Sequence, residues 1–297
     1  MKNLLILLSF LCLMSCESYS QTTQIDPVDN KLFNDYWYAG EAELTSYSLQ
    51  QARYGEIHEG HAVLVFVTEP FSASKQVKLD YPGRAGDDNV SVLKLNFTKK
   101  FITGIYPYSM MSSVFTPISY DKYPNTLKVS TSSQEWCGHT FMQLNLEKNH
   151  YALTGLSYFE SEGDVNEKLD KVYLEDELWT KIRINPATLP TGSFKIVPGT
   201  FHLRLKHIEA GSKIARGNLV VMDKSAFSES KHHKYSLKYD DRSLDIYFER
   251  NFPFQILGWE ETARGLTTTA VRKESLKSPY WQKNSNADRA LRKQLGL

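Results

Sequence analysis

The chain is dominated by short segments typical of β-strands, and the gaps between these segments are short. Residues 62–67 form a continuous apolar run rich in β-branched side chains, which is typical of a strand buried on both faces. Residues 90–97 and 126–130 alternate between apolar and polar side chains, as a strand with one buried face does. The gaps leave no room for the helical crossovers that parallel strands require, so we expect antiparallel pairing.

These patterns predict a mainly β fold built as a large antiparallel curved sheet, an open barrel or a β-sandwich. The 17 Tyr and 15 Phe support this prediction, because aromatic side chains favour strands. Residues 237–239 and 244–248 read as paired strands, and residues 240–243 between them read as a four-residue hairpin loop.

One mid-chain helix and one C-terminal helix are also expected. In residues 168–182 an apolar stripe recurs at helical spacing, and we place the acidic residues 175–177 towards solvent. Asn-Pro at 185–186 ends this helix, since proline restricts the residue before it. Residues 287–295 form the second helix, with Asn286 as N-cap and a solvated basic face.

The domain organisation follows from these elements. Residues 1–16 are expected to be a signal peptide with a lipobox, and residues 17–30 a flexible tether. Residues 31–185 form a β-rich half that ends in a helix, and residues 186–297 form a second β-rich half with the C-terminal helix. We prefer to treat the two halves as one continuous unit, because β units of about 200–250 residues are common.

The N-terminus carries an export signal. Lys2 precedes an apolar run at residues 4–14, which is too short to span a bilayer that needs roughly 20 apolar residues. The run ends in Leu-Met-Ser before Cys16, which resembles the bacterial lipobox, so Cys16 is expected to be acylated and to anchor the protein in a membrane. The localisation expected is an outer-membrane lipoprotein or a periplasmic protein. The alternative is a soluble secreted protein cleaved before Gln21.

The charge of the mature chain argues against nucleic acid as a partner. Lys2 is the one charged residue in residues 1–16, so after their removal 34 basic residues balance 34 acidic ones. A neutral chain has no overall field that attracts nucleic acid. With Cys16 acylated, Cys137 is left as the one free thiol, and the fold must be stabilised by its core.

The most unusual stretch for chemistry is residues 134–141. Taken as a continuous strand, it places Glu135, Cys137 and His139 on one face. These three are the candidate catalytic residues of a hydrolase or transferase. Strand neighbours two apart are separated by about 6.5–7 Å, however, whereas an activated nucleophile needs contact at about 3 Å. A structural reading of Cys137 as a packing residue is therefore preferred, unless a bulge at Gly138 brings the groups together.

The other histidines do not form a metal-binding motif. His58 and His61 lie in a glycine-flanked turn, and His232 and His233 are adjacent in a polar loop. A structural zinc site needs four ligands. The chain also lacks the nucleophile elbow, the phosphate-binding glycine loop and HExxH. No metal and no cofactor is expected.

Clustered aromatic side chains give the second hypothesis, a ligand-binding groove. Their rings offer apolar bodies with polar tips, which suit an apolar or extended ligand. An ordinary sheet core uses the same residues, and that reading stays open. The candidate ligand-binding residues are Tyr36, Trp37, Tyr38, Tyr106, Tyr108 and Trp136.

Several stretches resemble a family of exported β-rich bacterial envelope proteins of unknown activity, whose members often carry the label "septum formation inhibitor Maf". These stretches are residues 36–40, 51–56, 103–112, 134–139 and 177–183. True Maf proteins are cytoplasmic nucleotide pyrophosphatases of α/β fold with an early Ser-x-Ser-Pro-Arg-Arg signature. This chain lacks that signature, so the resemblance implies no Maf catalytic residue.

The sequence therefore favours a non-enzymatic envelope module that binds an apolar or extended ligand or a partner protein. The alternative is the enzyme centred on residues 135–139, and a Maf-type pyrophosphatase is disfavoured.

Overall fold

A computed structural model describes residues 25 and 27–297 of the chain. The predicted signal peptide, the predicted lipobox with Cys16 and most of the predicted tether at 17–30 lie outside these described residues. The described strands are β1 Ala42–Arg53, β2 Glu56–Ser72, β3 Asn89–Thr103, β4 Tyr106–Pro117, β5 Lys128–Glu135, β6 Gly138–Leu146, β7 His150–Ser157, β8 Val165–Asp170, β9 Tyr173–Leu174, β10 Gly192–Val197, β11 Lys213–Met222, β12 His232–Tyr239, β13 Arg242–Glu249, β14 Ile256–Ala263 and β15 Leu266–Ser278.

The helices of the described residues are short. The α-helices are α1 Asn30–Trp37, α2 Leu178–Ile184, α3 Thr200–Lys206 and α4 Ala290–Gln294. The 3₁₀ turns are η1 Pro82–Arg84, η2 Gly86–Asp88, η3 Glu175–Glu177, η4 Pro186–Thr188, η5 Tyr280–Gln282 and η6 Asn286–Arg289. No helix in this part of the chain is long and apolar enough to cross a membrane.

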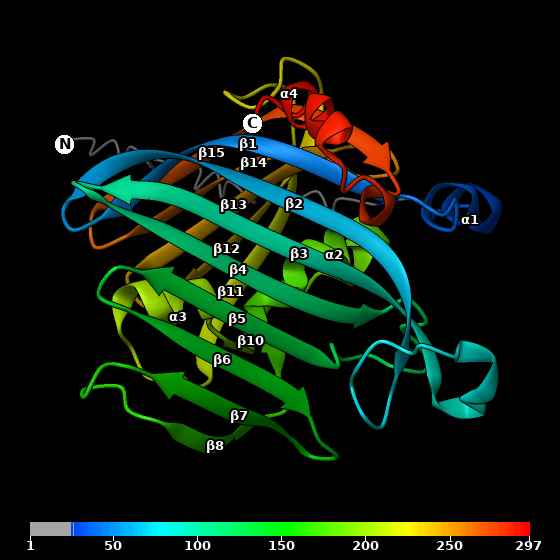
Figure 1. The fold of residues 1–297 in the computed structure, drawn as a ribbon, viewed down its shortest axis with the longest axis horizontal. Helices are drawn as coiled ribbons and strands as arrows, with labels where there is room; N and C mark the ends of the chain where they lie inside the picture. The colour runs from blue at the N-terminus through cyan, green and yellow to red at the C-terminus, as the bar shows by residue number, and fades with distance from the viewer. Residues whose placement is uncertain (1–24, 26) are drawn as a thin grey trace, which may run out of the picture.

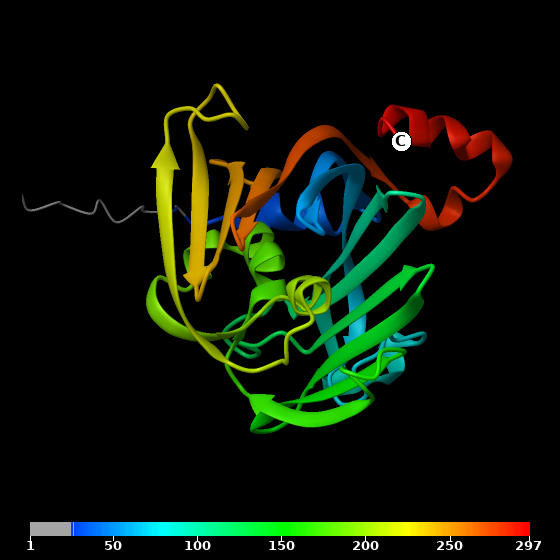
Figure 2. The same cartoon turned by 90° about the vertical axis from the view of Figure 1, so that its left-hand side faces the viewer.

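All of these strands belong to one 15-stranded sheet, in the order β8-β7-β6-β5-β4-β3-β2-β1-β15-β14-β13-β12-β11-β10-β9. Neighbouring strands are antiparallel except β9 and β10, which are parallel. The sheet is strongly curved and encloses the helices α2 and α3 (Figures 1 and 2). The predicted mainly β fold with a large curved antiparallel sheet is confirmed.

The two edges of the sheet meet at a seam, which makes it an open barrel. Edge strands β8 and β9 are separated by residues 171–172 alone. Asp170 of β8 forms a salt bridge with Lys195 of β10 (3.3 Å) and accepts a hydrogen bond from Ser212 Oγ (2.9 Å). The sheet includes strands from both sequence halves, 31–185 and 186–297.

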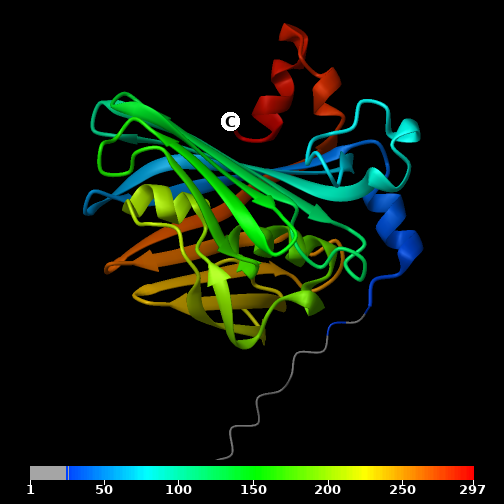
Figure 3. The ribbon, with the colours of Figure 1, turned by 90° about the horizontal axis from the view of Figure 1, so that it is seen from below.

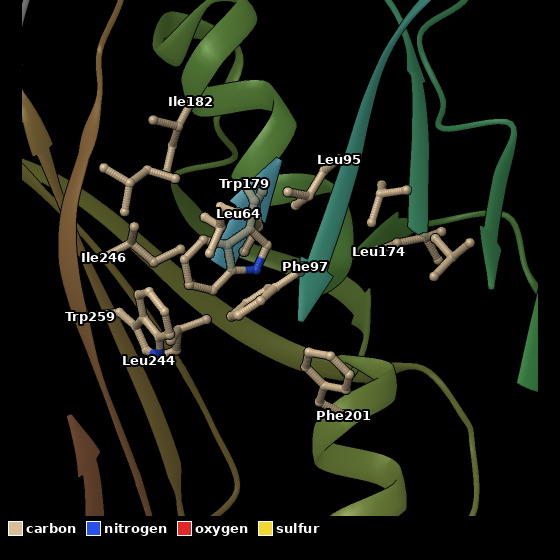
Figure 4. Packing of buried hydrophobic residues seen from close by; sticks show 14 of the residues in the cluster. Leu64, Leu95, Phe97, Leu174, Trp179, Ile182, Phe201, Leu244, Ile246 and Trp259 are labelled. Atoms are coloured by element: carbon tan, nitrogen blue, oxygen red, sulfur yellow. The ribbon is translucent and has the colours of Figure 1, made fainter. Parts of the chain in front are cut away.

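The core fills the inside of the curved sheet around α2 and α3. Phe97 of β3 packs edge-on against Trp179 of α2 and Phe201 of α3, with ring centroids 5.1 and 5.2 Å apart. Trp259 of β14 contacts Phe97 and Trp179 from the other side at 5.2 Å each (Figure 4). Both helices are consequently buried all round, unlike a surface helix with one apolar face.

This burial corrects the prediction for residues 168–182. The segment begins as strand β8 and passes through β9 and η3 before α2 starts at Leu178. Glu175, Asp176 and Glu177 are buried rather than solvated. Glu175 accepts a hydrogen bond from Arg242 (2.6 Å), and Asp176 accepts two from Thr200 (2.8 and 3.0 Å). The acidic side chains point into the barrel because the groups that satisfy them lie inside it, on strand β13 for Glu175 and on helix α3 for Asp176.

Two other details differ from the sequence-based expectation. The β12–β13 hairpin turns through residues 240–241 alone, and Arg242, expected in the loop, is a buried residue of β13. Within residues 62–67, Val63 and Val65 are half-buried, so β2 is fully buried on one face. At the C-terminus the expected helix is present as η6 and α4 with an exposed basic face, but Ser285 caps it instead of Asn286.

Candidate functional site

A cavity of about 170 Å³ lies between α3 and the inner face of strands β6–β8. Its apolar wall includes Met142, Leu153, Val165, Leu203 and Ile208. An engineered apolar cavity of about 150 Å³ accommodates benzene, so this space suits an apolar group of roughly six to eight carbon atoms. The cavity belongs to the seam of the barrel, where α3 and the edge of the sheet are not packed tightly together.

One end of the cavity is charged. Glu162, from the β7–β8 loop at residues 158–164, accepts a hydrogen bond from Arg204 Nη1 of α3 (3.0 Å). His207, the residue after α3, contacts the same carboxylate oxygen through Nδ1. Ser157 Oγ donates to the other oxygen of Glu162 (2.6 Å). The loop is thereby held against the C-terminal end of α3.

A second arginine approaches His207 from the barrel wall. Arg53, the last residue of β1, places Nη2 3.2 Å from His207 Nε2 and donates from Nη1 to the Leu205 carbonyl. Since a guanidinium only donates, Nε2 accepts from Arg53 and Nδ1 carries the proton donated to Glu162. Arg204 Nη1, 3.1 Å from Nδ1, then donates to the Glu162 carboxylate and not to the ring. This assignment makes His207 a neutral imidazole that links Arg53 to Glu162.

The backbone at His207 supports this arrangement. Its φ of 52° and ψ of 54° place it in the left-handed region, which non-glycine residues rarely adopt. Such a conformation costs about 1 kcal/mol or more and persists where neighbouring contacts hold it. Here the contacts through both ring nitrogens hold His207 at the cavity.

The pKa of Glu162 reflects its partners. Partial burial alone would raise it, but hydrogen bonds from Ser157 and His207 and the charge of Arg204 outweigh burial. The pKa of Glu162 is therefore lowered, and the carboxylate is ionised at neutral pH.

The two buried arginines at this end are not matched by buried carboxylates, because Glu167 and Glu209, which also line the cavity, are exposed. Arg53 and Arg204 are 9% and 8% exposed, and Glu162 is the carboxylate within salt-bridge distance of Arg204. Among the described residues, the Nε atoms of both arginines are buried without a hydrogen-bond partner. With His207 neutral, the cluster carries one positive charge in excess.

The structure brings Glu135 and Cys137 into contact but places His139, the third candidate catalytic residue, on the other face of the hairpin. Trp136 and Cys137 form the two-residue turn of the β5–β6 hairpin, so the stretch is not a continuous strand and its predicted face pattern is wrong. Glu135 is buried on the inner side, whereas His139, opposite Gln134, is exposed on the other face. A turn reverses the chain, which separates residues that a straight strand would align.

Cys137 itself is an exposed free thiol at the hairpin tip. A hydrogen bond to the Glu135 carboxylate raises the pKa of the Cys137 thiol, with a smaller contribution from desolvation. Glu135 also accepts the backbone N–H of Cys137 (2.6 Å). The neighbouring carboxylate thus disfavours the thiolate, the opposite of nucleophile activation.

The candidate aromatic residues fall at opposite ends of the barrel. Tyr36 and Trp37 lie in α1 and Tyr38 follows it, at the end away from α3 (Figures 1 and 3). Trp37 is buried, Tyr36 donates to Glu43, and Tyr38 Oη is 2.8 Å from Ser91 Oγ. These contacts fix α1 on the barrel.

The remaining candidates, Tyr106, Tyr108 and Trp136, lie at the end that carries the charged cluster. The ring of Tyr106 is 5.9 Å from that of Tyr108 and 6.5 Å from that of Trp136. Tyr108 Oη is 2.7 Å from Tyr54 Oη and accepts from Arg53 Nη2 (3.4 Å). The three aromatic residues therefore connect to the cavity through Arg53.

Exposed apolar side chains surround this end. Alternate hairpins of an antiparallel sheet turn at the same end, and β1–β2, β3–β4, β5–β6 and β7–β8 are four of the hairpins that turn here. Their tips expose Tyr54, Ile105, Trp136 and Tyr158. We call these four residues the hairpin rim.

A smaller space of about 30 Å³ lies deeper in the barrel, beside η3 and α3. Lys99 Nζ and His202 Nδ1 are 3.8 and 3.4 Å from Glu261, and Arg242 bridges Glu261 and Glu175. This volume is enough for about one water molecule. In the part of the chain that the structure describes, no group of three or more His, Cys, Asp or Glu side chains could hold a metal ion.

Sequence reasoning did not single out Arg53, Glu162, Arg204 and His207 as site residues. Arg53 and His207 are 154 positions apart, and Arg204 and Glu162 are 42 apart. No local motif marks residues that meet only when the sheet closes. The end of α3 could not be recognised from the sequence either. The left-handed residue that ends a helix is usually glycine, and here it is His207.

Comparisons with known proteins identify no family for this chain. No protein-family model matches it, and no curated protein matches it. It is similar to a solved structure described as a β-barrel-like protein of domain of unknown function DUF1849 from Brucella abortus. The TM-score is 0.46 at 8% sequence identity, over 80% of this chain and 96% of that one.

Proposed function

We propose that this protein is a non-enzymatic binding module that holds the apolar part of a small ligand between α3 and strands β6–β8. The cavity of about 170 Å³ beside α3 carries the proposal. Ligand sites combine an apolar wall with a few placed polar groups, and this cavity has both. The hairpin rim beside it offers further apolar surface to a ligand that extends out of the cavity.

The enzyme alternative gains no support from the geometry. Its three residues are divided between the inner face, the turn and the outer face of the β5–β6 hairpin. We therefore propose ligand holding rather than covalent chemistry at Cys137.

A titration with 1-octanol tests the binding proposal. Each buried methylene contributes about 0.8 kcal/mol, so six buried carbons support a Kd of roughly 0.1–1 mM. Ala210 lines the cavity, and Ala210→Phe is expected to fill it and to abolish octanol binding. Ala287→Phe makes the same change at an exposed position outside the cavity and should leave the affinity unchanged.

Equal octanol affinity in Ala210→Phe and Ala287→Phe would contradict binding in this cavity. Urea unfolding of both variants shows whether Ala210→Phe still folds. A folded Ala210→Phe variant that has lost octanol binding is the expected result.

We also propose that the protein acts in the cell envelope as a lipoprotein acylated at Cys16. The support is the lipobox-like sequence before Cys16. Intact mass of the protein from its native membrane fraction, beside Cys16→Ala, tests this. An acyl-sized increment that disappears in the variant is expected. A mature chain that begins at Gln21 without the increment would indicate a soluble secreted protein instead.

A further inference from the structure

We propose that the ligand of this cavity is a single-chain aliphatic carboxylate, whose head group binds Arg204 in place of Glu162. This inference rests on the proposed binding function and names its ligand class. It depends on the charge balance, the burial of the arginines and the shape of the polar end.

The charge balance at the polar end favours a monoanion. Arg53 and Arg204 meet the neutral His207 from two sides, at 3.2 and 3.1 Å. Glu162 provides one negative charge for these two cations. No salt bridge to Arg53 occurs among the residues that the structure describes. Its guanidinium donates hydrogen bonds to the Leu205 carbonyl, Tyr54 and Tyr108, but its positive charge has no counterion among these described residues.

Burial makes this excess charge significant. A cation removed from water requires a counterion or several hydrogen bonds, and both arginines are more than nine-tenths buried. The Nε atoms of Arg53 and Arg204 are donors without an acceptor within the described residues. The nearby Glu160, Asp164, Glu167 and Glu209 are exposed, where water screens their charges, although Glu167 and Glu209 line the cavity. An anionic head group entering from the cavity would supply the missing acceptor.

Glu162 indicates which anion fits. Its carboxylate lies between Arg204 and His207, so the space between them has the size of a carboxylate. Glu162 belongs to a loop rather than a strand. Besides Arg204 and His207, its carboxylate accepts a side-chain hydrogen bond from Ser157. A ligand carboxylate that makes the same contacts can replace it without disturbing the sheet.

The apolar wall determines the rest of the ligand. Met142 and Leu153 on the strands face Leu203 of α3 across the cavity, and Arg204 lines it from the next position of that helix. A carboxylate at Arg204 therefore has an apolar space directly beside it. A straight chain with roughly six to eight carbons fills a space of this size.

Three octyl compounds separate the head group from the chain. Octanoate, 1-octanol and octylammonium are titrated by calorimetry into the mature protein at neutral pH. Octanoate is expected to bind at least about 10-fold more tightly than 1-octanol, as hydrogen bonds to a buried charged group allow. Octylammonium is expected to bind more weakly than 1-octanol, because two buried arginines repel it.

Variants of the polar end make the test specific. Arg204→Met should reduce the ratio of octanoate to octanol affinity to about one, and Glu162→Gln should raise it, since the competing carboxylate is gone. Arg84→Met removes the same charge from an exposed position distant from α3 and should leave the ratio unchanged. If Arg204→Met does not fold, the affinity ratio measured for Glu162→Gln still tests the inference.

The outcomes distinguish this inference from the function on which it rests. If none of the three compounds binds, the proposed function fails together with the inference. If all three bind equally, the cavity holds an alkyl chain and the carboxylate inference is wrong. Tightest binding of octylammonium would mean that Glu162 receives the head group, which also overturns the inference.

Discussion

The two short helices inside the barrel carry their charges in different ways. Around α2 the buried charges are matched: Arg183 forms two hydrogen bonds of 2.6 Å to Glu43, and Lys181 lies 3.8 Å from Glu177. Around α3 Arg204 pairs with Glu162 beside an open cavity, and the neighbouring Arg53 has no carboxylate partner among the described residues. We infer that the matched charges around α2 stabilise the fold, and the proposed binding site depends on the unmatched charges at the cavity. The following experiments test this distinction.

The largest expected effect is on the matched pair at α2. Arg183→Met should lower the free energy of unfolding by about 3–5 kcal/mol, because it leaves Glu43 charged and buried without its partner. Urea unfolding at pH 7.5 measures the change. Lys195→Met, which breaks the exposed pair with Asp170, serves as control and should cost less than about 1 kcal/mol. Equal losses in the two variants would contradict a structural role for the α2 pair.

The pH dependence of stability should depend on Asp176, which connects η3 to α3 through Thr200. Burial raises the pKa of Asp176 from 3.8 to about 7. The folded protein then keeps a proton that the unfolded chain releases, so the contribution of Asp176 to stability falls as pH rises from about 4 to 7. Between pH 5 and pH 8 the free energy of unfolding of the wild type should fall by on the order of 2 kcal/mol because of Asp176, and Asp176→Asn should abolish this fall. Parallel pH profiles for wild type and variant would contradict this account.

The unmatched cluster at α3 should matter less for stability. Arg204→Met is expected to lower the free energy of unfolding by about 1–2 kcal/mol, because Glu162 is partly exposed and can be hydrated when its partner is lost. The same urea measurement as for Arg183→Met applies. A loss as large as that of Arg183→Met would remove the difference between the two helices.

The smallest expected effect is on the reactivity of Cys137. Because the Glu135 carboxylate raises the pKa of the thiol, Cys137 should react slowly with iodoacetamide at pH 7.5 despite its exposure. Glu135→Gln should increase the rate by less than about 10-fold. Mass spectrometry of the peptide that contains Cys137 measures the rate. A faster wild-type thiol would favour the enzyme alternative.

The sequence predicted the sheet well because strand signals are local. The alternation at residues 90–97 and 126–130 lies in or next to β3 and β5, and the gaps between strands correctly indicated antiparallel pairing. The C-terminal helix was found from its residue pattern, although Ser285 caps it instead of the predicted Asn286. These features depend on neighbours in sequence, which pattern reading can judge.

The interior helices show the limit of such patterns. In α3 the large apolar residues Phe201, Leu203 and Leu205 alternate as in a strand, yet the segment is helical. Because it is surrounded by the barrel, no polar face is required. For the same reason residues 175–177, which look solvated in sequence, are buried, and Glu175 and Asp176 are satisfied by Arg242 of β13 and Thr200 of α3, which are distant in sequence.

The candidate site was predicted only in part. Tyr106, Tyr108 and Trp136 lie at the end with the charged cluster, whereas Tyr36, Trp37 and Tyr38 lie at the other end. Arg53, Glu162, Arg204 and His207 come from β1, a loop and the end of α3. These four residues come together only because the sheet closes, and no residue spacing in the sequence predicts that contact.

A crystal structure of the mature protein with saturating octanoate tests the central claim most directly. The account predicts the carboxylate within hydrogen-bond distance of the Arg204 guanidinium, the chain beside Met142 and Leu153, and Glu162 displaced from its present position. Octanoate bound elsewhere, with Glu162 still paired to Arg204 and the cavity beside α3 unoccupied, would contradict it.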